Sequence, residues 1–192
     1  MIRCGIVHRE PGSLTPEDAR LLGRMVEAVA DDFLPSLAMR TSTTQKSLSS
    51  PTAGSVDAYL TGMLAQHTLL AWANDGSLAA FLSFRLNHVD PRFAGLGASA
   101  YVSTIAVMPQ FRREGFARRL YAALLQLPLG PSRLVLLRTW GSNVSHLDLL
   151  AEIGFEILAR DIDNRGPGVD TVYLGIPLGG RRLVAGSSRL VG

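Results

Sequence analysis

The sequence is poor in cysteine and in histidine. Its 192 residues contain one cysteine, Cys4, and four histidines. A single cysteine excludes an internal disulfide framework and any zinc site built on several thiolates. The histidines and acidic residues show no metal-ligand spacing, so we expect no metal ion.

Charged residues are scarce as well, at 18% of the chain, whereas hydrophobic residues make up 47%. This composition is typical of a globular protein rather than a disordered one. No apolar run is long enough to span a bilayer, and the first residues, MIRCGIVHREPG, lack the pattern of a signal peptide. We therefore expect a cytoplasmic protein with no membrane partner. The length favours a single domain, over residues 1–178, followed by a flexible tail over 179–192.

The net charge of +3 is a modest basic excess. The densest basic patches are the segment 112–119 and the tail residues Arg181, Arg182 and Arg189. No interleaving of aromatic and basic residues and no nucleic-acid-binding motif accompanies them, so we expect no nucleic-acid partner. A basic nucleic-acid-binding domain stays an alternative, and it predicts binding that weakens steeply with salt.

The most informative stretch is residues 100–127, AYVSTIAVMPQFRREGFARRLYAALLQL. Its first part is β-branched and aromatic, which is typical of a strand, and Pro109 ends that strand because proline has no N–H to donate. After residue 110 the apolar side chains recur every three to four positions, which predicts a helix. The turn between them holds Gly115 and small Ala117, and Arg112, Arg113, Arg118 and Arg119 surround it.

A strand that passes through such a turn into a helix N-terminus predicts a phosphate or pyrophosphate site. The first amides of a helix have no partner within it, and the helix dipole adds partial positive charge there. Gly115 has no Cβ and allows a ligand close to the backbone. A basic amphipathic helix with a glycine near its start and no ligand is the alternative.

Residues 107–117, VMPQFRREGFA, resemble the signature of the GCN5-related N-acetyltransferases (GNAT), V-x-P-x-(Y/F)-R-x-x-G-x-(G/A). In that family the turn binds the pyrophosphate of acetyl-CoA, and the strand before it pairs with the pantetheine arm through main-chain groups. The resemblance therefore implies acetyl-CoA as a co-substrate. The implied binding residues are Ile105, Ala106, Val107, Arg112, Arg113, Gly115, Phe116, Ala117, Arg118 and Asn143.

The rest of the chain fits the same family. Periodicity and turn signals predict the order β-α-α-β-β-β-α-β-α-β-β, with Thr15 as the cap of the first helix and Pro16 at its first position. The fold class we expect is α/β (α+β): the GNAT fold, with a mixed, mostly antiparallel sheet of about seven strands and helices on both faces. Strands are expected over residues 3–8, 67–73, 77–86, 101–107, 133–139, 155–161 and 169–177. Residues 41–55 and 88–97 are expected to be loops that border the acceptor pocket.

One position departs from the family pattern. Asn143 and the pair Gly154-Phe155 match the last family helix, but Leu150 stands where a tyrosine usually donates a proton to the departing thiolate. Leucine has no proton to donate, so the role is vacant, taken by another group or left to water. His146, one turn earlier on the same helix face, and Tyr173, in the last strand, are the candidates to replace it, and simple packing is the alternative for both.

The group that deprotonates the amine is less defined. Tyr101 and Ser103 share a face of the central strand, because side chains alternate along a strand, and they correspond to positions that line the acceptor pocket in related acetyltransferases. Tyr101 is therefore a further catalytic candidate. Glu27, Asp31 and Asp32 on the first helix are candidates to attract a cationic amine, although a solvated helix face also explains them.

These features predict an acetyl-CoA-dependent N-acetyltransferase that acts by direct transfer on a primary amine of a small molecule or peptide. A non-catalytic acyl-CoA-binding or regulatory module is the main alternative, and Leu150 supports it. Family members are often dimers, so a homodimer is among the expectations.

Overall fold

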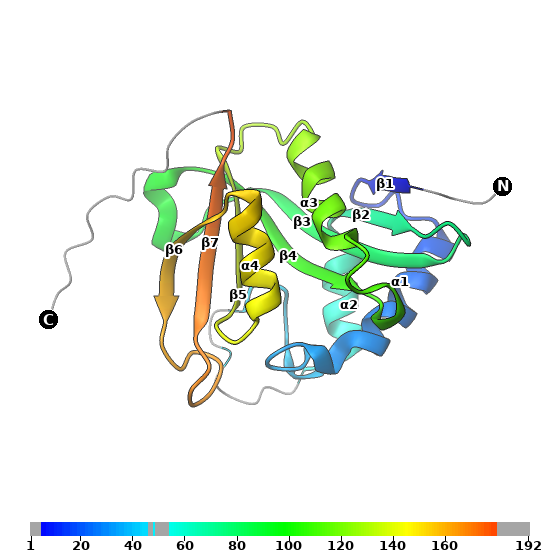
Figure 1. Ribbon diagram of the computed structural model, residues 1–192, viewed down its shortest axis with the longest axis horizontal. Helices are drawn as coiled ribbons and strands as arrows, with labels where there is room; N and C mark the ends of the chain where they lie inside the picture. Colours follow the sequence, from blue (N-terminus) through cyan, green and yellow to red (C-terminus); the bar gives the residue numbers. More distant parts are fainter. Residues whose placement is uncertain (1–4, 46–47, 49–53, 180–192) are drawn as a thin grey trace, which may run out of the picture.

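The computed structural model describes residues 5–45, 48 and 54–179. Seven strands form one sheet in the order β1-β2-β3-β4-β5-β7-β6, with helices on both faces (Figure 1). Neighbouring strands are antiparallel except for the parallel pair β4 and β5. The expected fold class is confirmed. The expected tail, apart from Gly179, and Cys4 lie outside the described residues.

The elements follow the expected order. The strands are β1 (Gly5–Arg9), β2 (His67–Trp72), β3 (Leu78–His88), β4 (Ser99–Val107), β5 (Leu134–Trp140), β6 (Glu156–Asp161) and β7 (Thr171–Pro177). The helices are α1 (Pro16–Val29), α2 (Val56–Leu64), α3 (Phe116–Gln126) and α4 (Val144–Ile153). Four short 3-10 helices were not predicted: η1 (Ala30–Asp32), η2 (Leu37–Met39), η3 (Pro91–Leu96) and η4 (Pro109–Phe111). The first of them continues α1, and η3 forms within a segment predicted to be a loop.

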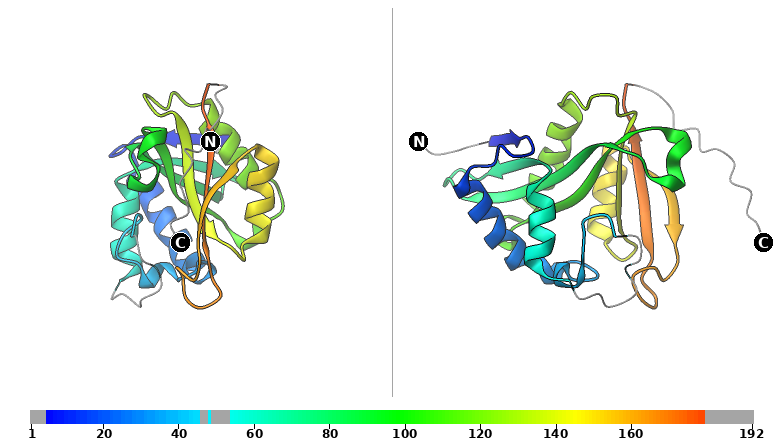
Figure 2. Two further views of the ribbon diagram at one scale, coloured as in Figure 1. Left: turned by 90° about the vertical axis from the view of Figure 1, so that its left-hand side faces the viewer. Right: turned by 180° about the vertical axis from the view of Figure 1, so that it is seen from behind.

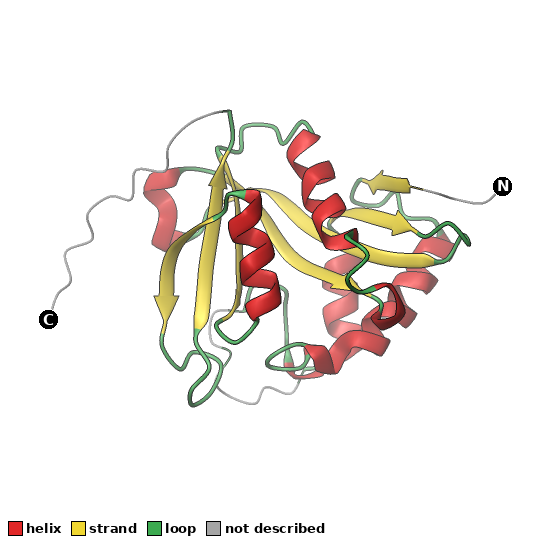
Figure 3. Cartoon of the chain, viewed as in Figure 1, coloured by secondary structure: helices red, strands yellow, loops and turns green. Residues whose placement is uncertain are grey.

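The sheet separates two helical layers. Helices α3 and α4 lie in front of it in Figure 3, and α1 and α2 cover the opposite face, as the edge-on and rear views of Figure 2 show. Each layer has its own core: Leu120, Leu124 and Leu150 pack on one face, and Leu22 and Met63 on the other. No described helix is long and apolar enough to cross a membrane.

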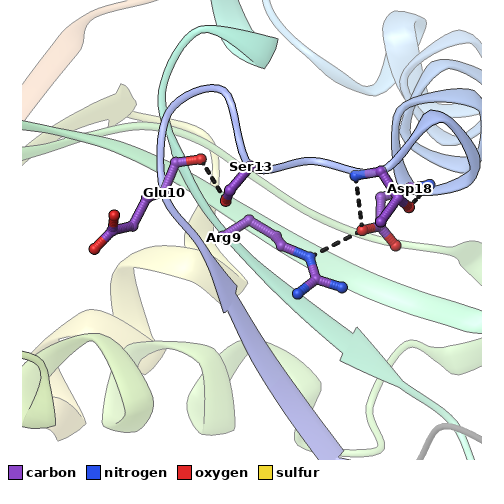
Figure 4. Close-up of polar contacts among 5 residues, drawn as sticks. Arg9, Glu10, Ser13 and Asp18 are labelled. Atoms are coloured by element: carbon purple, nitrogen blue, oxygen red, sulfur yellow. Dashed lines mark hydrogen bonds and ion pairs between the residues drawn. The ribbon is translucent and has the colours of Figure 1, made fainter.

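The start of α1 confirms the predicted cap. The Thr15 hydroxyl accepts a hydrogen bond from the Asp18 amide at 3.0 Å, and the Asp18 carboxylate accepts one from the Thr15 amide at 3.2 Å. Figure 4 shows that Arg9, at the end of β1, donates from Nε to the same carboxylate at 2.9 Å. Nearby, the Ser13 hydroxyl donates to the Glu10 carbonyl. Asp18 is fully buried, so this group joins the first strand to the first helix.

The parallel pair β4 and β5 is joined over only part of its length. Residues 99–102 of β4 pair with residues 134–137 of β5, and beyond this point no pairing continues. The strands β1 to β4 fan away from β5 and β7 in the rear view of Figure 2. The second half of β4 therefore has a free edge in the middle of the sheet.

A β-bulge lies at the point where β4 leaves β5. The register with β3 shifts between Ser83 and Phe84, which leaves Ser103 as the extra residue of β4. The Ser103 hydroxyl donates to Gln66 Oε1 at 2.6 Å, and the hydroxyls of Thr104 and Tyr59 are 2.6 Å apart. Two successive residues of β4 thus face the α2 layer, as expected where a bulge interrupts the alternation.

Candidate active site

A cavity of about 670 Å³ opens where β4 and β5 diverge. Tyr121 of α3 and His146 of α4 line it from one layer, and Phe33, after η1, and Arg165, between β6 and β7, line it from the other. The cavity therefore reaches both helical layers through the gap in the sheet. Such a site can hold a long ligand on one side and a second reactant on the other.

The free edge of β4 supplies main-chain hydrogen-bonding groups to this cavity. The Met108 amide donates to the carbonyl of Ala79 in β3, at 2.9 Å. Because main-chain groups alternate in direction along a strand, those of Ala106 also face β3, whereas those of Ile105 and Val107 face the gap. The Val107 carbonyl accepts a bond from Arg112 Nε at 3.3 Å, consistent with this direction. All three predicted residues of β4 line the cavity.

The start of α3 forms another part of the wall. Gly115 is the residue before the helix, with φ +79°, and no side chain caps the helix there. The amides of Phe116, Ala117 and Arg118 precede the first intrahelical bond, which runs from the Arg119 amide to the Gly115 carbonyl. A Cβ added at Gly115 would meet no heavy atom within 4 Å. Unpaired amides next to open space at a glycine fit the predicted phosphate site.

The arginines of this turn differ in their surroundings. Arg112 forms an ion pair with Asp32, and Arg118 forms one with Glu152 of α4. Arg113 has φ +66°, a left-handed conformation that few residues other than glycine adopt. All three line the cavity. The turn therefore combines free amides with guanidinium groups, two of which are already held in place by carboxylates.

Asn143 also lines the cavity, at the start of α4. Its amide nitrogen donates to the Thr139 hydroxyl of β5 at 3.1 Å, which fixes the side chain against the strand. No side chain caps α4. Asn143 therefore lies on the β5 side of the gap, opposite the free edge of β4.

His146 is the one catalytic candidate that the structure places on the cavity wall. Its Nε2 lies 2.9 Å from the hydroxyl of Tyr121, and the two rings stack with centroids 5.9 Å apart. Burial lowers the pKa of His146 to about 4, so the imidazole is neutral near pH 7. Burial also raises the pKa of Tyr121 far above its ordinary value. Two neutral side chains thus share a hydrogen bond next to the gap.

Tyr101 and Tyr173 do not line the cavity. Tyr101 is buried against His88, with ring centroids 4.6 Å apart, and Tyr173 packs against Phe93 and Arg92. Burial raises the pKa of Tyr101, although Arg138 acts in the opposite direction. Tyr101 is therefore unsuited to take a proton, and the strand parity that singled it out did not indicate how deeply it is buried.

The acidic candidates also differ in position. Asp32 lines the cavity, where it pairs with Arg112, whereas Asp31 accepts a bond from Ser36 at 2.8 Å. Glu27 does not line the cavity. No residue of the predicted loop 88–97 lines it either, and no described residue of the predicted loop 41–55 does; residues 46–47 and 49–53 of that loop lie outside the described residues. The described residues hold no cluster of metal-ligating side chains.

The second half of the wall was not predicted from the sequence. Arg40, Arg138 and Arg165 line the cavity, together with the aromatic rings of Phe33 and Trp140. These residues come from four separate segments and match no motif. Only folding brings them together, around one cavity.

Comparisons with known proteins agree with this geometry. Residues 37–155 match the model of the "Acetyltransferase (GNAT) family". A sequence search among curated proteins finds no match.

Several solved structures share the fold. Arabidopsis thaliana NAA60, solved with a bisubstrate analogue, is 15% identical with a TM-score of 0.63; 92% of this chain and 99% of that chain are covered. The ribosomal-protein-S18-alanine N-acetyltransferase of Escherichia coli is 16% identical with a TM-score of 0.59, over 93% and 97% of the two chains. A GNAT acetyltransferase of Streptococcus pneumoniae is 18% identical with a TM-score of 0.57, over 91% and 99%. Because the family model matches more than half of the sequence, the chain belongs to the GNAT acetyltransferase family.

Proposed function

We propose that this protein is an acetyl-CoA-dependent N-acetyltransferase that acts by direct transfer on a primary amine. The observation that carries the proposal is the continuity of one cavity from the free amides at Gly115, along the free edge of β4, to the opposite side of the sheet. Both reactants can therefore meet in the gap without a covalent enzyme intermediate. The N-acetyltransferases among proteins of the same fold support this reaction class.

The residues present fit acetyl-CoA. The amides of Phe116, Ala117 and Arg118 and the guanidinium groups around them suit a pyrophosphate, because both the helix N-terminus and arginine favour oxyanions. The main-chain groups of Ile105 and Val107 suit the amide-containing pantetheine arm, which adds to the edge like a short strand. Asn143, at the start of α4, bounds the same cavity on the β5 side.

When bound, acetyl-CoA would supply a thioester whose carbonyl carbon the neutral amine nitrogen attacks: a C–N bond forms, the C–S bond breaks, the thiolate leaves, and the nitrogen gives up one proton to water in the open cavity. The chain positions the two reactants, which by itself contributes a large part of the rate. The Val107 amide faces the gap and is placed to donate to the oxygen that gains charge during attack.

Tyr121 and His146 take the place of the tyrosine that Leu150 replaces. Leu150 is fully buried in the core and does not line the cavity. If the proton of the neutral imidazole lies on Nε2, His146 donates to the Tyr121 oxygen and leaves the phenol hydrogen free to bond a developing thiolate. Because a phenol is less acidic than a thiol, Tyr121 stabilises the thiolate by a hydrogen bond rather than by giving up its proton.

The test is turnover with acetyl-CoA and a broad panel of primary amines, measured by thiol release and by the mass of the acetylated product. We expect acetyl transfer to at least one small amine or peptide amine. Acetyl-CoA binding with no acetylated product from any amine would instead favour the non-catalytic module.

A further inference from the structure

Three arginines from distant segments meet at the end of the cavity away from α3. Arg40 follows η2, Arg138 lies in β5 and Arg165 lies in the turn between β6 and β7. All three line the cavity, and Arg40 and Arg165 are each only 8% exposed. Arginine is rarely buried without a specific partner, so we expect a negatively charged group to bind next to these three side chains.

No carboxylate in the described residues supplies it. Arg40 donates to the carbonyls of Pro35 at 3.1 Å and Leu34 at 3.4 Å. Arg165 donates to the Thr171 hydroxyl at 3.0 Å and to the Leu34 carbonyl, and Arg138 donates to the Gln45 carbonyl. These acceptors are neutral. By contrast, five other arginines of the described chain pair with carboxylates: Arg9, Arg92, Arg112, Arg118 and Arg160.

Burial and mutual repulsion disfavour the positive charges of Arg40 and Arg165. Burial, followed by the charges of Arg40 and Arg138, lowers the pKa of Arg165 to about 9. Burial and the charge of Arg138 also lower the pKa of Arg40. A buried positive charge without a counter-ion is unfavourable, and an anion bound between the three groups would relieve both desolvation and mutual repulsion.

Two guanidinium nitrogens of this group have N–H groups that could donate hydrogen bonds to such an anion. Nη1 of Arg138 and Nη2 of Arg165 make no hydrogen bond to the described residues, and neither atom is sealed from solvent. Aromatic rings hold the planes in place: Arg40 lies 5.5 Å from the centroid of Phe33, and Arg165 lies 5.8 Å from that of Trp140. Rigid guanidinium planes with free N–H groups favour paired hydrogen bonds to a carboxylate or phosphonate.

The location separates this group from the predicted pyrophosphate site. Arg138 and Trp140 alternate along β5 with Thr139, which bonds Asn143 on the α4 side. Because alternate side chains of a strand point to opposite faces, Arg138 and Trp140 face the α1 and α2 layer. The pyrophosphate turn belongs to the α3 layer. The arginines therefore lie where the amine substrate would bind, on the opposite face of the sheet from the predicted acetyl-CoA site.

We propose that the acceptor is a small amine that also carries an oxyanion, either a carboxylate or a phosphonate, and that Arg40, Arg138 and Arg165 bind this group. The inference rests on the proposed function, since it names the substrate class of the same site. It predicts discrimination against polyamines and other purely cationic amines, because the three arginines repel them.

A binding experiment tests the site without requiring turnover. Calorimetry with methylphosphonate is carried out on the wild type, on Arg138→Gln and Arg165→Gln, and on Arg138→Lys and Arg165→Lys, which keep the charge. Arg24→Gln is the matched control, because Arg24 is exposed on α1 away from the cavity. Gly115→Asp tests whether the anion binds at the pyrophosphate turn instead.

We expect methylphosphonate binding that is at least tenfold weaker in both glutamine variants, weaker in both lysine variants, and unchanged in Arg24→Gln and Gly115→Asp. Acetyl-CoA binding should be retained by the arginine variants, which also shows that they fold. No binding to the wild type, binding unaffected by the arginine changes, or binding lost only in Gly115→Asp would overturn the inference.

Turnover then tests the substrate class with matched amines: β-alanine against β-alaninamide, and aminomethylphosphonate against ethanolamine, with putrescine as the cationic case. We expect kcat/KM at least tenfold higher for the anionic member of a pair. Equal or faster turnover of neutral and cationic amines would overturn the inference and leave the proposed function standing. Arginine-dependent anion binding with no turnover of any amine would support the oxyanion site and overturn the proposed function.

Discussion

The hydroxyl of Tyr121 lies 2.9 Å from Nε2 of His146, and this contact joins α3 to α4 beside the gap in the sheet. The tyrosine is buried in the core, with its ring edge on Phe155 at a centroid distance of 5.5 Å. The pair is held by packing on one side and lines the cavity on the other. Tyr121 brings a phenol to the site from α3. In the family pattern the tyrosine lies on α4 instead, at the position of Leu150.

The first prediction concerns the pH dependence of stability. The pKa of His146 is about 4 in the folded chain and about 6.5 when unfolded, so the unfolded state binds more protons between these values. The free energy of unfolding should therefore be greatest above pH 6.5 and decrease as the pH falls toward 4. From pH 7 to pH 5 this one group should remove about 2 kcal/mol.

Urea unfolding of the wild type and of His146→Gln at the two pH values measures this effect. Glutamine can still bond Tyr121 but does not titrate, so the variant should lose about 2 kcal/mol less than the wild type over the same interval. Identical pH profiles for the two proteins would show that His146 is not held neutral by burial.

The second prediction concerns the phenol. Tyr121→Phe keeps the ring and removes the hydroxyl, so we expect kcat to fall about tenfold, the effect of one hydrogen bond to a charged group. The dissociation constant for acetyl-CoA should not change, because the role proposed for the hydroxyl is limited to the departing sulfur. Phe155→Leu is a packing control without a hydroxyl, and it should affect stability more than kcat. An unchanged kcat in Tyr121→Phe would remove the residue from the mechanism.

The third prediction concerns the junction of β1 and α1. Asp18 is fully buried and accepts bonds from Arg9 and from the Thr15 amide, so Asp18→Asn should destabilise the protein by about 3 kcal/mol, the cost of removing one charge from a buried pair. Glu17→Gln, an exposed change in the same turn, should cost less than about 0.5 kcal/mol. Chemical denaturation of both variants checks the difference, and equal effects would contradict the account.

The fourth prediction concerns the backbone that carries Arg40. A Cβ added at Gly54 would lie 2.6 Å from the Arg40 nitrogen, closer than real contacts allow. Gly54→Ala should therefore displace Arg40, raise the acceptor KM several-fold and lower the melting temperature. Gly62→Ala is the matched control, since its added Cβ meets nothing within 4 Å and alanine favours a helix by about 1 kcal/mol over glycine. A higher melting temperature for both variants would contradict the expected collision between the Cβ added at Gly54 and the Arg40 backbone.

The fold could be predicted because its signals are local. Thr15, Pro16 and Asp18 specify a helix start within four residues, and the change of period after Pro109 marks the passage from strand to helix. The turn at Gly115 could be predicted for the same reason, since its glycine, its arginines and its helix lie within one short segment; phosphate binding there stays a prediction. Sequence alone could not have placed the break between β4 and β5 at residue 102, which depends on pairing between distant strands.

The proposed acceptor side could not be predicted, because its residues are brought together only by folding. Arg40 and Arg165 are more than a hundred residues apart and share no motif. Strand parity indicated the face of Tyr101 correctly but not its burial against His88. The role assigned to Tyr121 was missed for a related reason: a tyrosine at helical spacing resembles a core residue, and only its contact with His146 distinguishes it.

Acetyl-CoA binding at the Gly115 turn is the central claim, and calorimetry on two aspartate variants tests it most directly. Gly115 and Gly12 both have φ +79° and open space around an added Cβ, but Gly12 lies in the turn before α1, away from the cavity. The backbone strain of the substitution is therefore matched, and only Gly115→Asp adds a negative charge beside the predicted pyrophosphate. We predict that the wild type and Gly12→Asp bind acetyl-CoA alike and that Gly115→Asp binds at least tenfold more weakly. Equal binding by all three proteins, or no binding by the wild type, would contradict the account.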